Sequence, residues 1–290
     1  MSAALAAEQA LNGLQLGLML FLMAAGLTLV LGIMDTINLA HGSLYMTGAY
    51  LAAATYAAAG SFLLAVVAAV VGTALIGALL EMTVLRALYR RDHLSQVLAT
   101  FAIILIANEA IRMTWGPQPL ALPTPRALSG PVELLPGFLY PAWRLVLIAA
   151  GLGVAVLLFI LVTYTRAGMR VRAGASNREM AEVMGVDVKR LFTVVFAIGA
   201  ALCALAGALL GPLLAVQVGM GESILILAFV VVVIGGIGSI RGAFVGALLV
   251  GIVDTAGRAL LVPALASIAI YVLMAAVLFW KPQGLFPARG

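Results

Sequence analysis

The sequence predicts an all-α integral membrane protein of about eight transmembrane helices with glycine-rich helix breaks. Three observations predict this class. Hydrophobic residues make up 64% of the chain and charged residues only 9%, too few to form the polar shell of a soluble domain. Apolar runs of membrane-spanning length recur along the whole chain. Polar or glycine-rich stretches interrupt these runs at two places.

Eight apolar runs are candidate transmembrane helices, because about 20 helical residues cross the ~30 Å hydrocarbon layer of a bilayer. They cover residues 11–33, 39–59, 62–85, 94–112, 143–164, 191–216, 224–253 and 258–280. The seventh run contains GGIGSIRG, whose glycines beside Arg241 predict two short helices with a break between them. No stretch fits a sizeable soluble domain, so residues 1–290 are predicted to form a single transmembrane domain.

The loops between the runs differ in charge, and this difference predicts the orientation of the chain. One short loop carries Arg86, Arg90 and Arg91, and a second, at about 165–190, is also rich in Arg and Lys. The segment at about 114–142 is instead rich in proline and nearly free of basic residues. By the positive-inside rule, the basic loops and the C-terminus face the cytoplasm and the proline-rich loop is external. The N-terminus faces outward if the second run is a full crossing and inward if it is re-entrant.

Composition and motifs also exclude several classes of function. The net charge of +5 would suggest nucleic-acid binding in a soluble protein, but here it reflects Lys and Arg gathered in loops, so we expect no nucleic-acid partner. The sequence contains no GxxxxGK[ST] motif and so no P-loop. We expect no catalytic residues and no metal site, because His41 is a lone histidine without a second candidate ligand nearby.

Three acidic residues in or near the runs have a basic residue within helical reach. Glu109 and Arg112 are three apart, and Asp254 and Arg258 are four apart, so each pair can share a helix face. A local ion pair with Arg86 is likewise expected for Glu81. Such pairing lowers the cost of placing a charge near the membrane.

The loop at about 165–190 contains the pattern of a short helix with one apolar face. A polar residue at position 176 or 177 can cap its start, and Gly185 can end it in the left-handed conformation. Met180, Val183 and Met184 fall at i, i+3 and i+4 and therefore share one face. At a membrane surface such a helix either lies on lipid or inserts into a groove on another protein, and we favour the groove.

A polar stretch interrupts the apolar sequence between positions 34 and 48. In a membrane its side chains need partners, so it should face a cavity or other protein rather than lipid. The residues that we predict to line a solute path here are Asn38, His41, Gly42, Ser43 and Thr47, with Asp35 and Thr36 beside them. The alternative is that these residues only cement helix packing. For His41 itself, a neutral, hydrogen-bonded imidazole is favoured over a proton relay.

The second interruption has the same form, an apolar run before it and a small-residue helix after it. Its predicted path residues are Gly235, Gly236, Gly238 and Ser239. Transporters often place broken helices in corresponding halves, where freed backbone groups meet the solute, so the two regions suggest an internal repeat. The alternative is that the glycines merely permit tight helix crossing.

Four sequence motifs that sample most of the chain resemble those of a known class of transporter. Glu179, Met180 and Ala181 followed by Gly185 resemble the EAA-x-x-x-G signature of the coupling helix in ABC importer permeases, with Met180 in place of the usual Ala. Residues 31–50 (LGIMDTINLAHGSLYMTGAY) resemble the first conserved block of the branched-chain amino-acid permease family. Residues 231–251 (VVVIGGIGSIRGAFVGALLVG) and 281–287 (KPQGLFP) also resemble sequences of this family.

The resemblance implies an ABC importer permease in a bacterial inner membrane, which carries branched-chain amino acids or a similar small solute into the cytoplasm. It implies a second homologous permease subunit, two ATP-binding cassette subunits and an external solute-binding protein. ATP and Mg²⁺ would bind to the ATPase partners, with no cofactor in this chain. The residues that would contact the ATPases are Glu179, Met180, Ala181, Val183, Met184 and Gly185.

Other functions stay open at this point. Relatives in this family are associated with urea, short amides and small organic acids, and no residue here excludes those solutes. An ion-coupled secondary transporter would need acidic residues gathered inside the membrane. The four candidates, Asp35, Glu81, Glu109 and Asp254, are scattered along the chain. A structural scaffold would have no need for an exposed helix with one apolar face.

Overall fold

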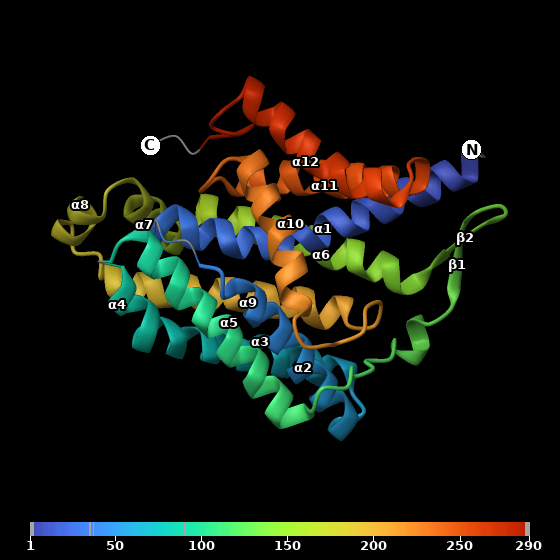
Figure 1. Cartoon of the computed structure of the whole chain (residues 1–290), viewed down its shortest axis with the longest axis horizontal. Coiled ribbons are helices and arrows are strands. Elements are labelled where there is room, and N and C mark those ends of the chain that lie inside the picture. Colours follow the sequence, from blue (N-terminus) through green and yellow to red (C-terminus); the bar gives the residue numbers. More distant parts are fainter. Residues whose placement is uncertain (1–2, 35, 37, 90, 288–290) are drawn as a thin grey trace.

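The chain folds into a bundle of long helices, most of which run along one direction (Figure 1). The computed structural model describes residues 3–34, 36, 38–89 and 91–287. Six helices in this part of the chain are long and apolar enough to cross a membrane. They are Leu5–Met34, Phe62–Leu88, His93–Trp115, Ala142–Tyr164, Val188–Leu210 and Ile240–Leu260. A helical membrane protein is therefore confirmed, whereas the predicted count of eight crossings is not.

The elements follow one another in this order: α1 (Ala3–Met34), α2 (His41–Ala59), α3 (Phe62–Leu80), the π-helix η1 (Glu81–Leu85), α4 (Arg86–Leu88), α5 (His93–Trp115), the 3₁₀-helix η2 (Arg126–Leu128), β1 (Pro131–Leu135), β2 (Phe138–Pro141), α6 (Ala142–Tyr164), α7 (Arg166–Ser176), α8 (Arg178–Val183), α9 (Val188–Leu210), α10 (Met220–Gly235), α11 (Ile240–Leu260) and α12 (Pro263–Trp280). Serine and acidic caps begin several of these helices. Ser61 accepts a hydrogen bond at the start of α3, and Asp92 and Asp187 do so at the starts of α5 and α9.

Helices α1 and α9 form the centre of the bundle. Helix α1 packs against α6, α9, α10 and α11, and α9 packs also against α2 and α3. The most apolar stretch of α1 is 83% buried and that of α9 is 67% buried, against 17–22% for α3, α5 and α6. Small residues allow the close contacts, as at Gly17 of α1, where a Cβ would lie 2.8 Å from the carbonyl oxygen of Ala247 on α11.

Helices α3, α5 and α6 present apolar side chains to the outside. Leu63, Phe101 and Leu157, one on each helix, are 73%, 51% and 61% exposed. An apolar surface of this extent would be costly in water but is normal against hydrocarbon or another membrane subunit. The charge-poor runs of the sequence thus become the periphery of the bundle as well as its core.

The proline-rich segment departs from the prediction of an entirely helical chain. Strands β1 and β2 pair antiparallel within it, in a register that places Val132 opposite Tyr140. Gly137 lies in the turn between them with φ of +79°, a conformation that glycine adopts without a Cβ penalty. The apolar residues on either side of a Pro-Gly turn therefore form a short hairpin rather than an irregular loop.

The predicted break in the seventh run is confirmed, since α10 ends at Gly235 and α11 begins at Ile240. Only the first of the two pieces is short, because α10 has 16 residues and α11 has 21. The eighth run starts later than predicted, since Arg258 belongs to α11. Helix α12 instead begins at Pro263, at a position where the missing N–H of proline costs nothing.

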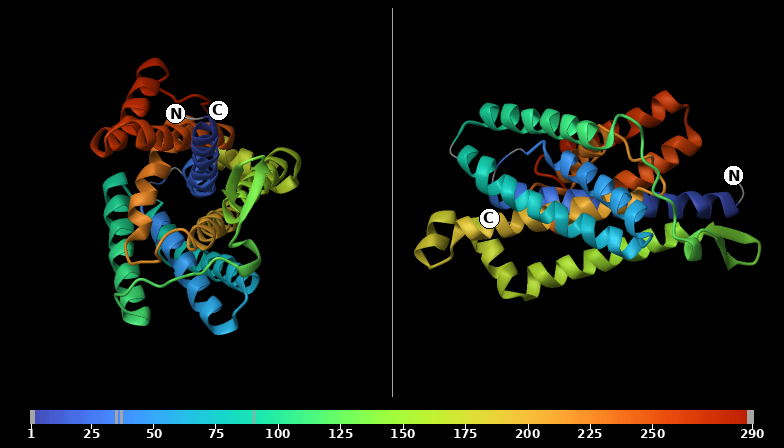
Figure 2. Two further views of the ribbon diagram at one scale, coloured as in Figure 1. Left: turned by 90° about the vertical axis from the view of Figure 1, so that its right-hand side faces the viewer. Right: turned by 90° about the horizontal axis from the view of Figure 1, so that it is seen from below.

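The loops lie at the two ends of the bundle as their charges predict. Helices α7 and α8 and the connection from α4 to α5 lie at one end, and the hairpin β1–β2 and the start of α1 lie at the other (Figures 1 and 2). The two basic loops are thus on the same side, as the positive-inside rule requires. We call these the α8 end and the hairpin end. Arg90 of the first basic loop falls outside the described residues.

Candidate functional site

The basic loop at 165–190 contains two helices where the sequence predicts one. Helix α7 begins at Arg166, capped by Thr165, whose hydroxyl accepts a hydrogen bond from the N–H of Gly168 at 3.0 Å. Gly168 packs so closely on α6 that a Cβ would lie 2.3 Å from the carbonyl oxygen of Val162. The chain therefore turns back at once on leaving α6, and α7 connects the membrane helix to α8.

The start of α8 matches the predicted cap. Of the two candidate positions, 176 and 177, the second is the one used. The side-chain oxygen of Asn177 accepts a hydrogen bond from the N–H of Met180 at 2.9 Å. Glu179, in the first turn, places its negative charge near the positive end of the helix.

The end of α8 depends on Gly185, as the sequence predicts. Its φ is +85°, and its N–H donates to the carbonyl of Glu182 at 2.9 Å. The N–H of Val186 donates to the carbonyl of Ala181, also at 2.9 Å. Together these two bonds form a Schellman motif, in which the left-handed residue satisfies the last free carbonyls of the helix.

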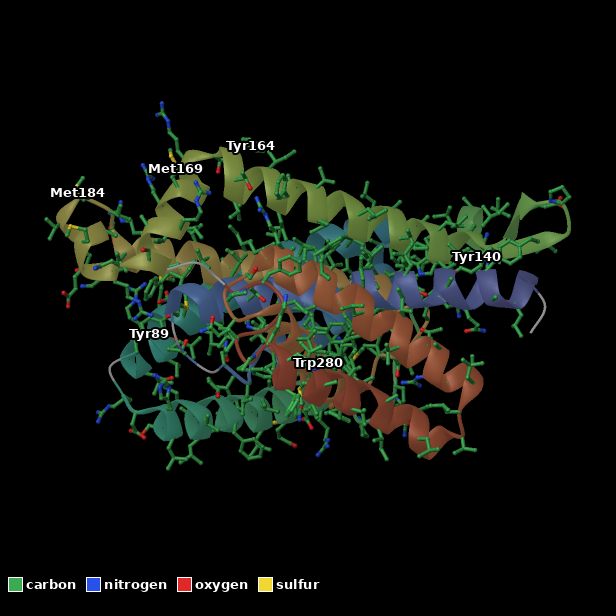
Figure 3. All side chains as sticks on the ribbon, turned by 90° about the horizontal axis from the view of Figure 1, so that it is seen from above. Tyr89, Tyr140, Tyr164, Met169, Met184 and Trp280 are labelled. Atoms are coloured by element: carbon green, nitrogen blue, oxygen red, sulfur yellow. The ribbon has the colours of Figure 1, made fainter. Side chains whose placement is uncertain are left out.

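The apolar face of α8 points away from the rest of the protein. Met180, Val183 and Met184, which we call the α8 face, are 58%, 81% and 76% exposed. Figure 3 shows Met184 at the far tip of the α8 end. Ala181 of the same motif is only 4% exposed and lies on the opposite side, against the protein. The six predicted coupling residues are therefore not all on one surface.

Asn38 holds the described part of the first break, residues 36 and 38–40, in shape; Asp35 is outside the described residues. Asn38 is 1% exposed, and its side-chain oxygen accepts a hydrogen bond from the N–H of Ala40 at 2.9 Å. This is an Asx turn, which lets the chain reverse direction between α1 and α2. The side-chain nitrogen of Asn38 lies 3.4 Å from Nδ1 of His41, the first residue of α2.

His41 lies at the point where α1, α2 and α9 meet. It is completely buried, and its ring contacts Phe196 of α9 edge-on, with the centroids 5.7 Å apart. A Cβ on either Gly26 of α1 or Gly199 of α9 would lie 3.2 Å from Nε2 of His41. Glycine at these two positions therefore makes room for the imidazole. Its Nε2 has no hydrogen-bond partner among the described residues.

Three further path candidates lie along α2. Gly42 packs against α10, where a Cβ would lie 2.5 Å from the carbonyl oxygen of Gly221. The hydroxyl of Thr47 donates to the carbonyl of Ser43 within the same helix at 2.7 Å. The hydroxyl of Ser43 is buried and has no partner in the described part of the chain. Gly42 thus provides close packing, while Ser43 retains an unused polar group.

A small pocket lies beside the first break. It is lined by Thr36, Asn38, Leu85, Leu88, Tyr89, Gln96 and Thr100. The amide nitrogen of Gln96 donates to the carbonyls of Leu88 and Arg91, whereas its oxygen is buried without a partner among the described residues. Gln96 and Thr100 of α5 thus lie with Asn38 around one pocket. These two residues cannot be identified from the sequence alone, because a residue on α5 carries no local signal of where the first break lies.

The second break, Gly236–Ser239, contains two glycines with positive φ. Gly236 and Gly238 have φ values of +102° and +79°. The hydroxyl of Ser239 accepts a hydrogen bond from the N–H of Gly242 at 3.1 Å and so caps α11. Gly235 packs on the same turn, since its Cβ would lie 2.4 Å from the carbonyl oxygen of Gly242. Three of the four predicted residues therefore shape the backbone of the break, and Ser239 starts the next helix.

The motif at 281–287 folds back onto this break. The N–H groups of Leu285 and Phe286 donate to the carbonyls of Ile234 and Gly235, at 2.8 and 3.0 Å. Carbonyls at a helix end lack a partner within the helix, so the tail segment supplies one for α10. Contact is close enough that a Cβ on Gly236 would lie 2.8 Å from the carbonyl oxygen of Phe286. Two of the motifs that define the resemblance thus form one structural unit.

The end of α1 also lies next to the second break. A Cβ on Gly32, near the end of α1, would lie 2.7 Å from the Cα of Gly238. The second break therefore lies against the last turn of α1, which leads into the polar first break. Residues 9–278 of the chain match the family described as the permease component of branched-chain amino acid transport systems. The chain belongs to this permease family.

Curated relatives of this permease match it over nearly its whole length. The high-affinity branched-chain amino acid transport system permease protein LivH of Escherichia coli strain K12 is 31% identical over 297 residues, which cover 96% of this chain and 94% of LivH. LivH of Salmonella typhimurium is 30% identical over the same shares. BraD of Pseudomonas aeruginosa is 29% identical over 290 residues, with 96% and 94% coverage. The comparison with solved structures finds no match.

The family membership confirms the resemblance that the sequence motifs indicate. The chain is a multi-pass membrane protein and a component of a transport system, and its relatives are described as permeases rather than enzymes. Within the described ranges, no three His, Cys, Asp or Glu side chains gather as metal ligands would.

Proposed function

We propose that the chain is the membrane subunit of an ATP-driven importer that moves branched-chain amino acids, or a closely related small amino-acid-like solute, into the cytoplasm. The single observation that carries this proposal is the α8 face, an apolar surface on a rigidly capped helix at the basic end of a permease. Such a surface is costly in water and fits a hydrophobic groove on a partner. The branched-chain solute is taken from the names of LivH and BraD.

The partners follow from this assignment. Two ATP-binding cassette subunits would bind Glu179, the α8 face and Gly185 from the cytoplasm, and would hold the ATP and Mg²⁺. A second homologous permease would pack on the exposed apolar helices, and a solute-binding protein would dock outside. The basic loops support an orientation with the α8 end and the C-terminus in the cytoplasm of a bacterial inner membrane. ATP hydrolysis then changes which side of the path is open, and no bond in the solute is broken.

The path itself is proposed to run past the two breaks. Asn38, His41 and Ser43 at the first break, and the freed backbone at Gly236 and Gly238, supply polar groups in an apolar setting. Such groups can meet the charged ends of an amino acid, while neighbouring aliphatic side chains meet its apolar side chain. Urea, short amides and small organic acids would suit the same polar groups, so they are the alternative solutes. Scattered acidic residues make an ion-coupled transporter the weaker alternative.

Recovery of the complex tests this function. A tagged chain purified from its native membrane should bring with it a second permease and two ATPases, identified by mass spectrometry, and the preparation should hydrolyse ATP. The binding protein can then be screened with leucine, isoleucine, valine, urea and acetamide. Recovery of the chain alone, with uptake in liposomes driven by an ion gradient, would instead support the secondary transporter.

Asn38→Leu tests the path at the first break. We expect uptake per assembled complex to fall by about fivefold, the equivalent of ~1 kcal/mol, because a buried hydrogen-bonding group is lost. Asn12→Leu is the matched control, since Asn12 accepts a hydrogen bond from Tyr140 at 2.9 Å at the hairpin end. If Asn38→Leu blocks assembly of the complex before it reduces uptake, the packing interpretation of the first break is the better one.

A further inference from the structure

A buried carboxylate at the α8 end has no part in the function proposed so far. Glu81 is 0% exposed and is the first residue of the π-helix η1, where α3 ends. The guanidinium group of Arg86 donates to both of its oxygens, at 3.3 and 2.9 Å. This confirms the local ion pair that the sequence predicts. A carboxylate placed this deep is costly unless further groups share its charge.

Two further side chains share the charge of Glu81 through hydrogen bonds, and one of them comes from a helix that is distant in the sequence. The hydroxyl of Tyr89 donates to one oxygen of Glu81 at 3.0 Å, and the hydroxyl of Thr193 donates to the other at 2.6 Å. Arg86 also donates to Thr193 at 2.7 Å. Thr193 lies in the second turn of α9, so one carboxylate ties the end of α3 to the start of α9. Charge-assisted bonds of this kind are the strongest that side chains make.

The residues around Glu81 also connect to α8, through Phe192. The guanidinium carbon of Arg178, the first residue of α8, lies 5.3 Å above the ring of Phe192, and Tyr89 contacts that ring edge-on with centroids 5.3 Å apart. Nε of Arg178 donates to the carbonyl of Ile33 at 3.0 Å, next to the end of α1. Helix α8 therefore touches both α1, just before the first break, and the group of side chains around Glu81.

Tyr89 connects that group to the proposed path. Its side chain lines the pocket beside Asn38, and Figure 3 shows it at the α8 end of the bundle. The backbone around Glu81 is also unusual, because the N–H of Arg86 bonds to the carbonyl of Glu81 five residues earlier. Such π turns are rare and occur often at functional sites.

We infer that Glu81 is a positioning residue that links α8 to the first break; the inference rests on the proposed ATP-driven function. When the ATPases move α8, the start of α9 moves with it. The bonds from Thr193 and Tyr89 to Glu81 then carry that displacement to η1 and to the wall of the pocket at Asn38. Without the carboxylate, ATP hydrolysis continues but moves the path less effectively.

The test compares solute transported per ATP hydrolysed in proteoliposomes that contain the whole complex. Glu81→Gln and Thr193→Val should each lower this ratio by roughly tenfold, within the usual range of coupling energies. Thr193→Val leaves the Glu81–Arg86 pair intact, so it remains informative if Glu81→Gln does not fold. Thr193→Ser retains the hydroxyl, so this variant should transport as much solute per ATP hydrolysed as the unmodified complex.

The matched control is Asp254→Asn. The Asp254 side chain is 4% exposed and pairs with Arg258 at 2.9 Å, but both residues lie on α11, so the pair joins no two helices. The Asp254→Asn variant should have a lower Tm but should transport as much solute per ATP hydrolysed as the unmodified complex. An unchanged ratio in Glu81→Gln and Thr193→Val, with only Tm lowered, would make the Glu81 group purely structural and overturn the inference. An unmodified complex without ATP-dependent uptake would overturn the proposed function itself, and this inference with it.

Discussion

Gly48→Val should leave little folded protein in the membrane, whereas Gly153→Val should leave the yield unchanged. Gly48 lies on α2 against α9, and a Cβ there would be 2.3 Å from the Cα of Ala204 and 2.6 Å from its Cβ. Both distances are shorter than any real Cβ contact, and the first obstacle is backbone, which cannot rotate away. The helices must therefore separate along their contact, at a cost of about 3 kcal/mol or more.

The neighbouring contact makes relief by a small shift difficult. One turn further along the same interface, a Cβ on Gly207 of α9 would lie 2.3 Å from the carbonyl oxygen of Tyr45. Small residues on both helices thus bring the two backbones together, which is a main source of helix association where lipid removes the hydrophobic driving force. Moving α2 outward at Gly48 would also lose the packing at Tyr45.

Gly153 on α6 provides the same substitution without the steric conflict. It is exposed on the periphery, and apart from the neighbouring backbone of α6 no atom among the described residues lies within 4 Å of its Cβ position. The measurement is the monodisperse fraction after detergent extraction, together with the Tm of what is recovered. Equal yield and Tm for the two variants would show that α2 and α9 are not packed as closely as described.

The fold could be predicted where a local rule decides it. Charge-poor runs of about 20 residues place helices in a membrane irrespective of their neighbours, and the glycines at 235–238 break a helix wherever it lies. The hairpin was missed although its signal is local. The Pro-Gly pair at positions 136 and 137 lies between two short apolar runs, which is a typical turn signal. The high proline content of the whole segment, however, favours an irregular loop over paired strands.

The candidate site likewise has features that the local sequence predicts and others that it does not. The cap at Asn177, the end at Gly185 and the exposed α8 face follow from spacing within one short segment, and the structure has all three. The contact of the tail with Gly236 and the bond from Thr193 to Glu81 join residues far apart in the chain. No periodicity reports such contacts. A family motif also mixes roles, since Ala181 packs inward while its neighbour Met180 faces out.

Gly185→Val should separate ATP hydrolysis from transport without reducing membrane insertion. At φ of +85°, any residue with a Cβ is disfavoured by about 1–2 kcal/mol, and a β-branched residue by more. Apart from Gly185 and its two chain neighbours, no atom of the described residues lies within 4 Å of the Cβ position, so the penalty arises in the local backbone. The chain can relieve it only by giving up the Schellman bonds at Glu182 and Ala181. A helix of six residues cannot lose its last turn and still present Val183 and Met184 together.

Gly137→Val is the matched control for this prediction. Its φ of +79° and its open surroundings reproduce those of Gly185, but it lies in the hairpin turn at the opposite end of the bundle. Gly185→Asn should retain most of the transport, because asparagine enters the left-handed region at lower cost than valine. ATP-driven uptake and ATP hydrolysis are measured on the same reconstituted complexes.

Together the three variants distinguish loss of the α8 face from misfolding of the whole subunit. If α8 transmits the motion, Gly185→Val alone should lower uptake relative to hydrolysis, Gly185→Asn should lie between it and the unmodified chain, and Gly137→Val should match the unmodified chain. Because each change acts on one turn outside the membrane helices, insertion and yield should stay constant across all three. Normal ATP-dependent uptake by Gly185→Val would mean that the ATPases act on another part of this end, and the α8 face would then need a different partner.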